Sequence, residues 1–229
     1  MNAFEEGKLI LINKPLDWTS FDVVRKIRAL IRIKKVGHAG TLDPLATGLL
    51  IVCTGKFTKR INEYMAQEKE YTGTFTVGAI TPTFDLESEP DHLKPYHHLS
   101  ETQIKNTTKQ FTGEIMQVPP IHSAIKVGGK PVYKLARKGQ EVQLEPRKLF
   151  IREFEITKIE LPLIHFRVVC STGTYIRSLA HDFGQALGTG AYLSNLCRTR
   201  IGNFELKDSM TIEEAERWIH SQLATGNGQ

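Results

Sequence analysis

Short runs and alternating patterns of hydrophobic residues predict six β-strands along the chain. The first run, KLILIN at residues 8–13, is short enough for a buried strand, and Pro15 ends it. The segment EYTGTFTVGA alternates in the way expected of a half-buried strand. The expected strands are residues 8–13, 49–53, 70–79, 148–160, 164–171 and 191–204.

Helices are expected where apolar residues recur every three to four positions next to a capping residue. We expect Ser20 to cap a helix whose apolar stripe faces inward and whose arginines face outward. Ser100 with Gln103, and Thr211 with Glu214, have the spacing of capping boxes. The expected helices follow Ser20, span about 58–66, 100–113 and 175–187, and begin at Thr211. Because strands and helices mix without a steady βαβ rhythm, the pattern predicts an α+β fold.

Two segments have the composition of loops. Residues 81–95 are acidic and interrupted by prolines. Residues 119–146 are bounded by prolines, include Gly128 and Gly129, and have a short basic helix expected around 133–138. We expect this second segment to protrude as an insertion from a single domain that spans residues 1–229.

The composition is that of a soluble globular protein and argues against membrane-spanning and secreted classes. Of the 229 residues, 40% are hydrophobic and 24% charged, which is enough for one large core or two modest ones. No apolar run reaches the length of a membrane span and the N-terminus lacks a secretory signal, so we expect a cytoplasmic protein. The three cysteines, Cys53, Cys170 and Cys197, lie far apart in apolar stretches, which predicts reduced thiols.

Basic residues are concentrated in two segments of a chain whose formal charge is +5. Six lysines and arginines lie between Val23 and Val36 with no acidic residue among them. A second basic stretch runs through the 119–146 insertion. Patches of this kind attract nucleic-acid phosphates. A solvated helix face explains the same charges equally well, so both interpretations stay open at this level.

The segment GHAGTLDPLATG at residues 37–48 combines loop-forming residues with chemically reactive ones. Its three glycines permit unusual backbone angles, and Pro44 favours an extended backbone at Asp43, so we expect Asp43 at a rigid corner of a loop. Taken alone, an Asp before a proline is more often a cap for a turn. The sequence contains no phosphate loop, dinucleotide fingerprint or metal-ligand cluster, so any chemistry is expected to use side chains alone.

The same segment resembles the signature of the tRNA pseudouridine synthase B family, G-H-x-G-x-L-D-P-x-A-x-G, at every fixed position. Four further blocks are similar to the family and follow its order. They are NKP at 13–15, KEYTGTFTVG at 69–78, PPIHSAIKVGGKPVYKLARKG at 119–139, and STGTYIRSLAHDFGQALG at 171–188. The resemblance therefore covers about residues 8–204.

The resemblance implies a pseudouridine synthase fold, with a mixed but mainly antiparallel sheet flanked by helices and the insertion as a protruding thumb. It implies that Asp43 is the catalytic nucleophile or its equivalent, with attack at ribose C1′ and at uracil C6 both open. Arg177 matches the arginine that pairs with this aspartate. Tyr71 matches the tyrosine that stacks on the target base and assists removal of the C5 proton. No cofactor or metal is expected, since the bonds exchanged lie within one nucleotide.

Five other residues have implied roles in holding the RNA. His38 matches a histidine that holds the rearranged loop open, and Leu196 matches an apolar wall of the uracil pocket. Lys14 is assigned a supporting or phosphate-facing role. Lys130 and Lys134 of the thumb are expected to contact phosphates.

By resemblance, the substrate is the T-arm stem-loop of tRNA, where uridine 55 becomes pseudouridine. Such a loop is recognised by its shape and splayed bases, and the target base must be extruded before it can react. We expect the protein to act as a monomer. The chain ends soon after the helix at 211–223, where most bacterial members have a small RNA-binding PUA domain, so we expect that domain to be missing.

Two other classes of function remain as alternatives. A catalytically silent RNA chaperone of the same fold would keep the basic thumb and His38 but would not depend on Asp43. A glycosidase or nucleosidase would also use a carboxylate at an anomeric carbon and would release free base. We identify no second carboxylate that the matching blocks assign to this chemistry, which makes this last class the weaker alternative.

Overall fold

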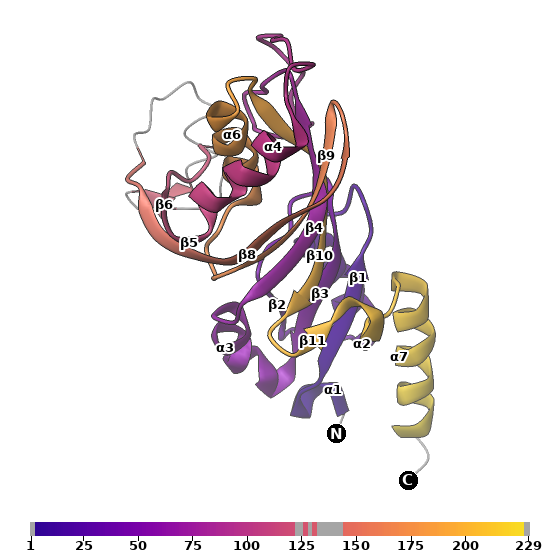
Figure 1. The fold of residues 1–229 in the computed structure, drawn as a ribbon. Helices are drawn as coiled ribbons and strands as arrows, with labels where there is room; N and C mark the ends of the chain where they lie inside the picture. The colour runs from indigo at the N-terminus through magenta and orange to yellow at the C-terminus, as the bar shows by residue number, and fades with distance from the viewer. Residues whose placement is uncertain (1–2, 122–125, 128–129, 132–143, 227–229) are drawn as a thin grey trace. The chain divides into compact units, whose positions relative to one another are not determined.

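The computed structural model describes residues 3–121, 126–127, 130–131 and 144–226, and its ribbon is shown in Figure 1. The chain forms two compact units, Met1–Tyr71 with Leu196–Gln229, and Thr72–Asn195. Strands β4 (Lys69–Val77) and β10 (Ala191–Ile201) have residues in both units. The α+β class is confirmed, because helices accompany a mainly antiparallel sheet. A single catalytic domain with a thumb stays a prediction.

The sheet of the first unit is built around β3 (Ala46–Thr54), whose residues are almost all buried. Strand β1 (Leu9–Lys14) pairs with it antiparallel, from Leu9 opposite Cys53 to Lys14 opposite Gly48. Strand β2 (Val36–Ala39) is also antiparallel to β3, and β11 (Phe204–Glu205) forms a hairpin with β10. Strand β10 runs parallel to the start of β3. Burial on both faces explains why β3 is a continuous apolar run in the sequence.

The helices of the first unit begin near the predicted positions, with one correction to a cap. Helix α2 (Ser20–Ile31) is capped by Thr19, because Thr19 and Asp22 exchange hydrogen bonds in a capping box. Ser20, which we expected as the cap, is buried instead. Helix α7 (Ile212–Gly226) has the predicted box, with Thr211 N–H donating to Glu214 at 2.8 Å.

Two apolar clusters cover the two faces of this sheet. One joins the inward stripe of α2 to residues of β1, β3 and α7. The other joins residues of β2, β3 and β10 to the short helices η1 (Gly55–Arg60) and α3 (Ile61–Met65). A helix was predicted over 58–66, and the structure has a 3₁₀ turn followed by a short α-helix there. The short helix α1 (Ala3–Glu6) adds Phe4 to the first cluster.

The second unit has the strand order β4-β9-β8-β5. The long strands β8 (Arg147–Glu160) and β9 (Leu163–Cys170) match the prediction closely. Aromatic rings fill the core, with Phe75 and Phe166 stacked at 4.1 Å between centroids. Helices α4 (Glu101–Thr107), η2 (Thr108–Phe111) and α6 (Ile176–Ala186) belong to this unit, and Ser100 caps α4 as predicted.

Strand β5 (Gly113–Gln117) was not predicted. The sequence indicates Gly113 only as the end of a helix, whereas its positive φ of 92° turns the chain into a strand antiparallel to β8. Two of the five residues of β5 are exposed, so the strand has little of the apolar signal on which sequence prediction depends.

Most of the predicted thumb cannot be compared with the structure. Within 119–146, strands β6 (Lys126–Val127) and β7 (Lys130–Pro131) pair antiparallel. Lys134, the Gly128–Gly129 turn and the basic helix expected at 133–138 lie outside the described residues. None of the helices in the described part of the chain is long and apolar enough to cross a membrane.

Candidate active site

Asp43 lies in the connection between β2 and β3 in the first unit. The connection is shorter than the loop we predicted, because Gly37 and His38 belong to β2 and Gly48 belongs to β3. The Asp43 carbonyl accepts a hydrogen bond from Ala46 N–H at 3.0 Å, which closes a tight turn over Pro44. Asp43 is half-buried and is therefore presented at a fixed corner, as expected.

Two glycines of the motif are required by geometry. Gly40 has φ +91° and Gly48 has φ +101°, values that strain any residue with a side chain. A Cβ on Gly48 would lie 2.4 Å from the carbonyl oxygen of Arg198 and 2.7 Å from its nitrogen. Gly48 therefore allows β10 to pair closely with β3, with Leu196 opposite Ala46 and Arg198 opposite Gly48.

Side chains from two earlier segments hold the backbone around Asp43. The Ser20 hydroxyl accepts from Leu42 N–H at 2.9 Å and donates to the Leu42 carbonyl at 3.2 Å. Lys14 Nζ donates to the Pro44 carbonyl at 3.3 Å and to the carbonyls of Pro15 and Trp18 at 2.9 and 2.5 Å. The residues on both sides of Asp43 are thus tied to α2 and to the end of β1.

Lys14 is a buried cation beside the candidate nucleophile. Burial lowers its pKa to about 8, while the negative charges of Asp43 and then Asp17 act in the opposite direction. The two roles left open for Lys14 were supporting and phosphate-facing. Its full burial and its three carbonyl partners support the first, since it presents no surface to a phosphate in this conformation.

Arg198 is a second buried cation that sequence reasoning missed. Its Nε donates to the Leu49 carbonyl at 2.8 Å, and its terminal nitrogens donate to the carbonyls of Gly40 and Thr41 at 3.1 and 3.4 Å. The signal that could have found it was a charged residue two positions after Leu196, on the same face of a predicted strand. A charge at an inward-facing position indicates a specific set of partners.

The other candidate residues of the first unit lie in strands. His38 in β2 is half-buried, and burial lowers its pKa, with a hydrogen bond to the Gly40 backbone opposing the shift. Among the residues that the structure describes, none hydrogen-bonds to its Nδ1. Leu196 is buried, and its carbonyl accepts from the Thr47 hydroxyl at 3.4 Å. Tyr71 is buried within β4. The structure therefore joins Lys14 to the Asp43 connection and Leu196 to the start of β3.

Arg177 belongs to the second unit, in α6, and it is not a surface residue. Its side chain is 6% exposed, its Nε lies 3.6 Å from a carboxylate oxygen of Asp85, and it donates to the Thr83 carbonyl at 3.4 Å. Sequence reasoning missed Asp85 because the acidic segment 81–95 has the composition of a solvated loop, although this carboxylate is buried. The pairing of Arg177 with Asp43 stays a prediction.

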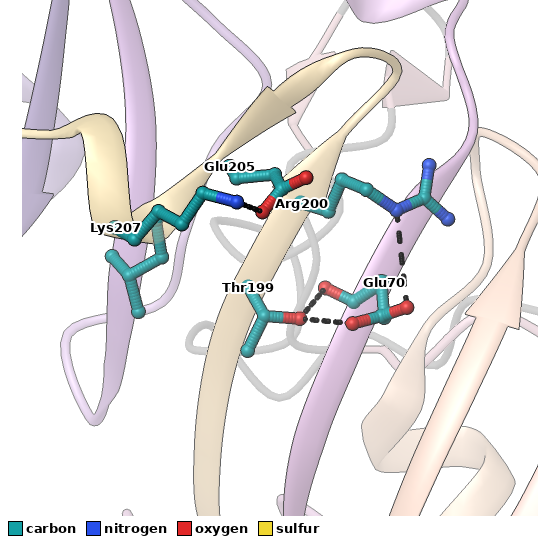
Figure 2. A pocket seen from close by; sticks show the side chains of 6 residues that line it. Glu70, Thr199, Arg200, Glu205 and Lys207 are labelled. Carbon is teal, nitrogen blue, oxygen red and sulfur yellow. Dashed lines mark hydrogen bonds and ion pairs between the residues drawn. The ribbon is translucent and has the colours of Figure 1, made fainter.

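A charged cavity of about 360 Å³ is lined by residues of β4, β10, β11 and the turn that follows β11. One of the lining residues, Glu70, directly precedes Tyr71 in the sequence. Figure 2 shows how its charges pair across the cavity: Lys207 with Glu205 at 2.6 Å, and Arg200 with Glu70 at 3.8 Å. Thr199 donates to Glu70 at 2.8 Å. These groups satisfy one another, so the cavity offers no evident reactive group. No cluster of three or more possible metal ligands is found among the described residues.

Comparison with known proteins gives a consistent family. The model of the TruB family pseudouridylate synthase N-terminal domain matches residues 28–176. The model of the tRNA pseudouridylate synthase B C-terminal domain matches residues 177–225. A tRNA pseudouridine synthase B of Flavobacterium johnsoniae is 56% identical over 90% of this chain and 93% of its own. One of Chlorobaculum tepidum is 48% identical over 91% and 89%.

The fold also resembles that of a chain in a solved H/ACA RNP. An H/ACA RNP bound to a substrate RNA containing 2'-deoxyuridine matches with a TM-score of 0.72 and 28% identity. The match covers 99% of this chain, which spans 57% of the length of the solved chain. With two family models over most of its length and close relatives that match nearly end to end, the chain belongs to the TruB family of pseudouridylate synthases.

Proposed function

We propose that the protein converts uridine 55 in the T-loop of tRNA to pseudouridine, with Asp43 as the essential carboxylate. The observation that carries the proposal is the fixed presentation of Asp43, whose flanking backbone groups are bonded to Ser20 and Lys14. The names of the relatives support tRNA as the substrate. The solved relative with a bound substrate RNA supports RNA binding by the same fold.

In the proposed reaction, the Asp43 carboxylate attacks ribose C1′ or uracil C6. The bond from N1 to C1′ breaks, the base turns, and a bond from C5 to C1′ forms. The bond to Asp43 breaks, the C5 proton leaves, and N1 gains a proton. The product is an isomer of the substrate, so no group is gained and no cofactor is consumed. A carboxylate suits this step because it is anionic at neutral pH and stabilises positive charge that grows at C1′.

Cations support the carboxylate in this proposal. Lys14 interacts electrostatically with Asp43 within the first unit. Arg177 is assigned to pair with Asp43 in the closed site, and Asp85 orients its guanidinium through their ion pair. Tyr71 and Leu196 are assigned to the two sides of the uracil, and His38 to the opened RNA loop. A target base must leave its stack to reach these groups.

The RNA backbone is held by the basic thumb in this proposal. Lys130 and Lys134 are assigned to phosphates of the T-arm, which would give binding a strong dependence on salt. We also propose that the protein acts as a monomer in the cytoplasm and that residues 1–229 form one catalytic domain.

Tritium release from a T-arm stem-loop labelled at uridine C5 tests the proposal. We expect release by the wild type without free uracil. Asp43→Asn keeps the shape of the side chain but loses its charge, so it should lose activity by at least three orders of magnitude, roughly the scale seen when a catalytic nucleophile is removed. The variant should bind the stem-loop with a similar Kd.

Each other outcome points elsewhere. Full activity of Asp43→Asn would overturn the role of Asp43. Free uracil among the products would indicate a nucleosidase. Tight binding by the wild type without any tritium release would indicate a silent RNA chaperone of the same fold.

A further inference from the structure

Arg198 bonds to the start of the connection that presents Asp43 and to strand β3, which follows that connection. Before Asp43 in the sequence, its two terminal nitrogens donate to the carbonyls of Gly40 and Thr41. After Asp43, its Nε donates to the carbonyl of Leu49 in β3. One planar guanidinium therefore fixes the start of the Asp43 connection relative to the strand that follows it, in a way that only arginine can with its rigid fork of donors.

Among the described residues, no acidic side chain pairs with the buried charge of Arg198. Its side chain is among the largest fully buried ones. In the portion of the chain that the structure describes, no carboxylate lies within ion-pair distance of it, and its hydrogen bonds go to backbone carbonyls. Burying a cation costs free energy, and an apolar side chain would fill the same space at lower cost. The charge at this position is therefore explained by the hydrogen bonds that the guanidinium donates and not by packing.

Arg200, two positions later on β10, has the usual arrangement of a partly buried arginine, because acidic side chains pair with it. It is half-buried, and its guanidinium lies 3.0 Å from Glu68 and 3.8 Å from Glu70. It also donates to the carbonyl of Gly202 at 2.8 Å, and among the residues that the structure describes it makes no bond to the Asp43 connection. The two arginines share a strand and a side-chain volume, and of the two only Arg198 reaches the connection.

Arg198 also lies near the other charged residues of the candidate site. Burial is the main reason that the pKa values of Lys14 and His38 are lowered, and the positive charge of Arg198 lowers both further. The approach of β10 that brings Arg198 to this place is the one that requires glycine at position 48. Geometry and charge thus locate Arg198 beside the same short connection.

We infer that Arg198 is a positioning residue of the isomerisation: it holds the Asp43 connection in its reactive geometry by bonding the carbonyls of Gly40, Thr41 and Leu49. The inference rests on the proposed function, because it takes Asp43 as the attacking group. It assigns Arg198 no contact with RNA. Loss of these three hydrogen bonds should therefore slow the chemical step and leave RNA affinity nearly unchanged.

The test compares Arg198→Met and Arg198→Lys with the matched control Arg200→Met. Single-turnover tritium release at saturating enzyme gives the rate of the chemical step, and a separate binding measurement gives Kd for the stem-loop. We expect Arg198→Met to slow the step by about 100-fold, since a small misplacement of a reacting group costs roughly this much. Arg198→Lys keeps the charge but loses the planar set of donors, so its rate should lie between those of Arg198→Met and wild type.

Kd should stay within about threefold of wild type in both Arg198 variants, because an interaction that acts only on the reacting geometry changes the rate alone. The control Arg200→Met should match wild type in both rate and Kd. A wild-type rate in Arg198→Lys and Arg198→Met would overturn the inference. So would a rate loss that is matched by an equal loss of RNA affinity and by a lowered Tm, which is the pattern of general destabilisation.

If Arg198→Met does not fold, Arg198→Lys alone decides between these outcomes. The inference and the proposed function fail differently. An inactive wild type, or a fully active Asp43→Asn, would defeat the proposed function. An active wild type and inactive Asp43→Asn, combined with Arg198 variants at full rate, would defeat only the inference.

Discussion

At the scale of single residues, the candidate site depends on which groups hydrogen-bond to its buried charged side chains. Lys14 and Arg198 are both fully buried and both donate to carbonyl oxygens around the Asp43 connection. Sequence resemblance pointed to Lys14 but could not tell a supporting role from a phosphate contact, because the difference depends on burial. It gave no role to Arg198 or Asp85, because their partners are backbone groups or residues far along the chain.

The lowered pKa of Lys14 predicts a pH dependence of stability. In the folded protein Lys14 loses its proton near pH 8, whereas in the unfolded chain it stays charged to about pH 10.5. Below pH 8 Lys14 is protonated in both states, so the free-energy cost of burying its charge is fully present in the folded protein. Between these values the unfolded state binds more protons, and the contribution of Lys14 to the free energy of unfolding rises with pH, by about 3 kcal/mol in total.

Urea unfolding of wild type and Lys14→Met at pH 7 and pH 10 checks this sign. The free energy of unfolding of the wild type, minus that of the variant, should increase between the two pH values. Taking the difference removes the titration of groups that are common to both proteins. A difference that stays flat, or that falls with pH, would show that Lys14 keeps its proton throughout this range.

At the scale of elements, strands and helices with strong periodicity were predictable and irregular ones were not. The alternation in β8 and β9 and the stripe of α2 come from burial of one face, which the sequence records directly. The cap of α2 was assigned to Ser20 instead of Thr19, since both are hydroxyl residues. The capping box of Thr19 with Asp22 and the long-range bonds from Ser20 to Leu42 distinguish them.

The close pairing of β3 with β10 predicts that Gly48→Ala is strongly destabilising. The new Cβ would meet the Arg198 backbone at 2.4 Å, in addition to the strain of a positive φ. We expect a loss of roughly 3 to 5 kcal/mol in the free energy of unfolding, and a proportionate loss of activity, because the backbone on both sides must shift.

Gly113→Ala is the matched control for the effect of φ alone. Gly113 has φ +92°, similar to Gly48, and a Cβ added there would meet nothing within 4 Å among the described residues. It should lose only about 1 kcal/mol, the usual cost of a strained backbone angle. Equal losses in urea unfolding of the two variants would mean that the approach of β10 is not the reason for glycine at position 48.

At the scale of the whole molecule, the family and the α+β class could be predicted from motif blocks in the correct order, and both are confirmed. The division into two units could not, because it depends on which strands share a core. The first unit combines the two ends of the chain, and the second is the segment between them. Periodicity along the sequence contains no information on that grouping.

RNA binding by the thumb predicts a specific salt dependence. Replacing Lys130, Lys134 and Lys138 with glutamine should weaken binding of the stem-loop and reduce the slope of log Kd against log salt by about 0.7 to 0.9 for each phosphate that is no longer neutralised. Lys56→Gln is the control, because Lys56 is an exposed lysine of the first unit that pairs with Glu6 at 2.6 Å. An unchanged slope in the triple variant would remove the thumb from the binding surface.

The parallel pairing of β3 with β10 also has a consequence for the order in which the protein can be made. Arg198 follows Leu49 by 149 residues, and its strand completes the support of the Asp43 connection. At about 5 to 20 residues per second, the ribosome adds Arg198 roughly 7 to 30 seconds after Leu49. The nascent chain therefore has its signature motif long before it can hold that motif in place, and modification of RNA must wait until Arg198 has been synthesised.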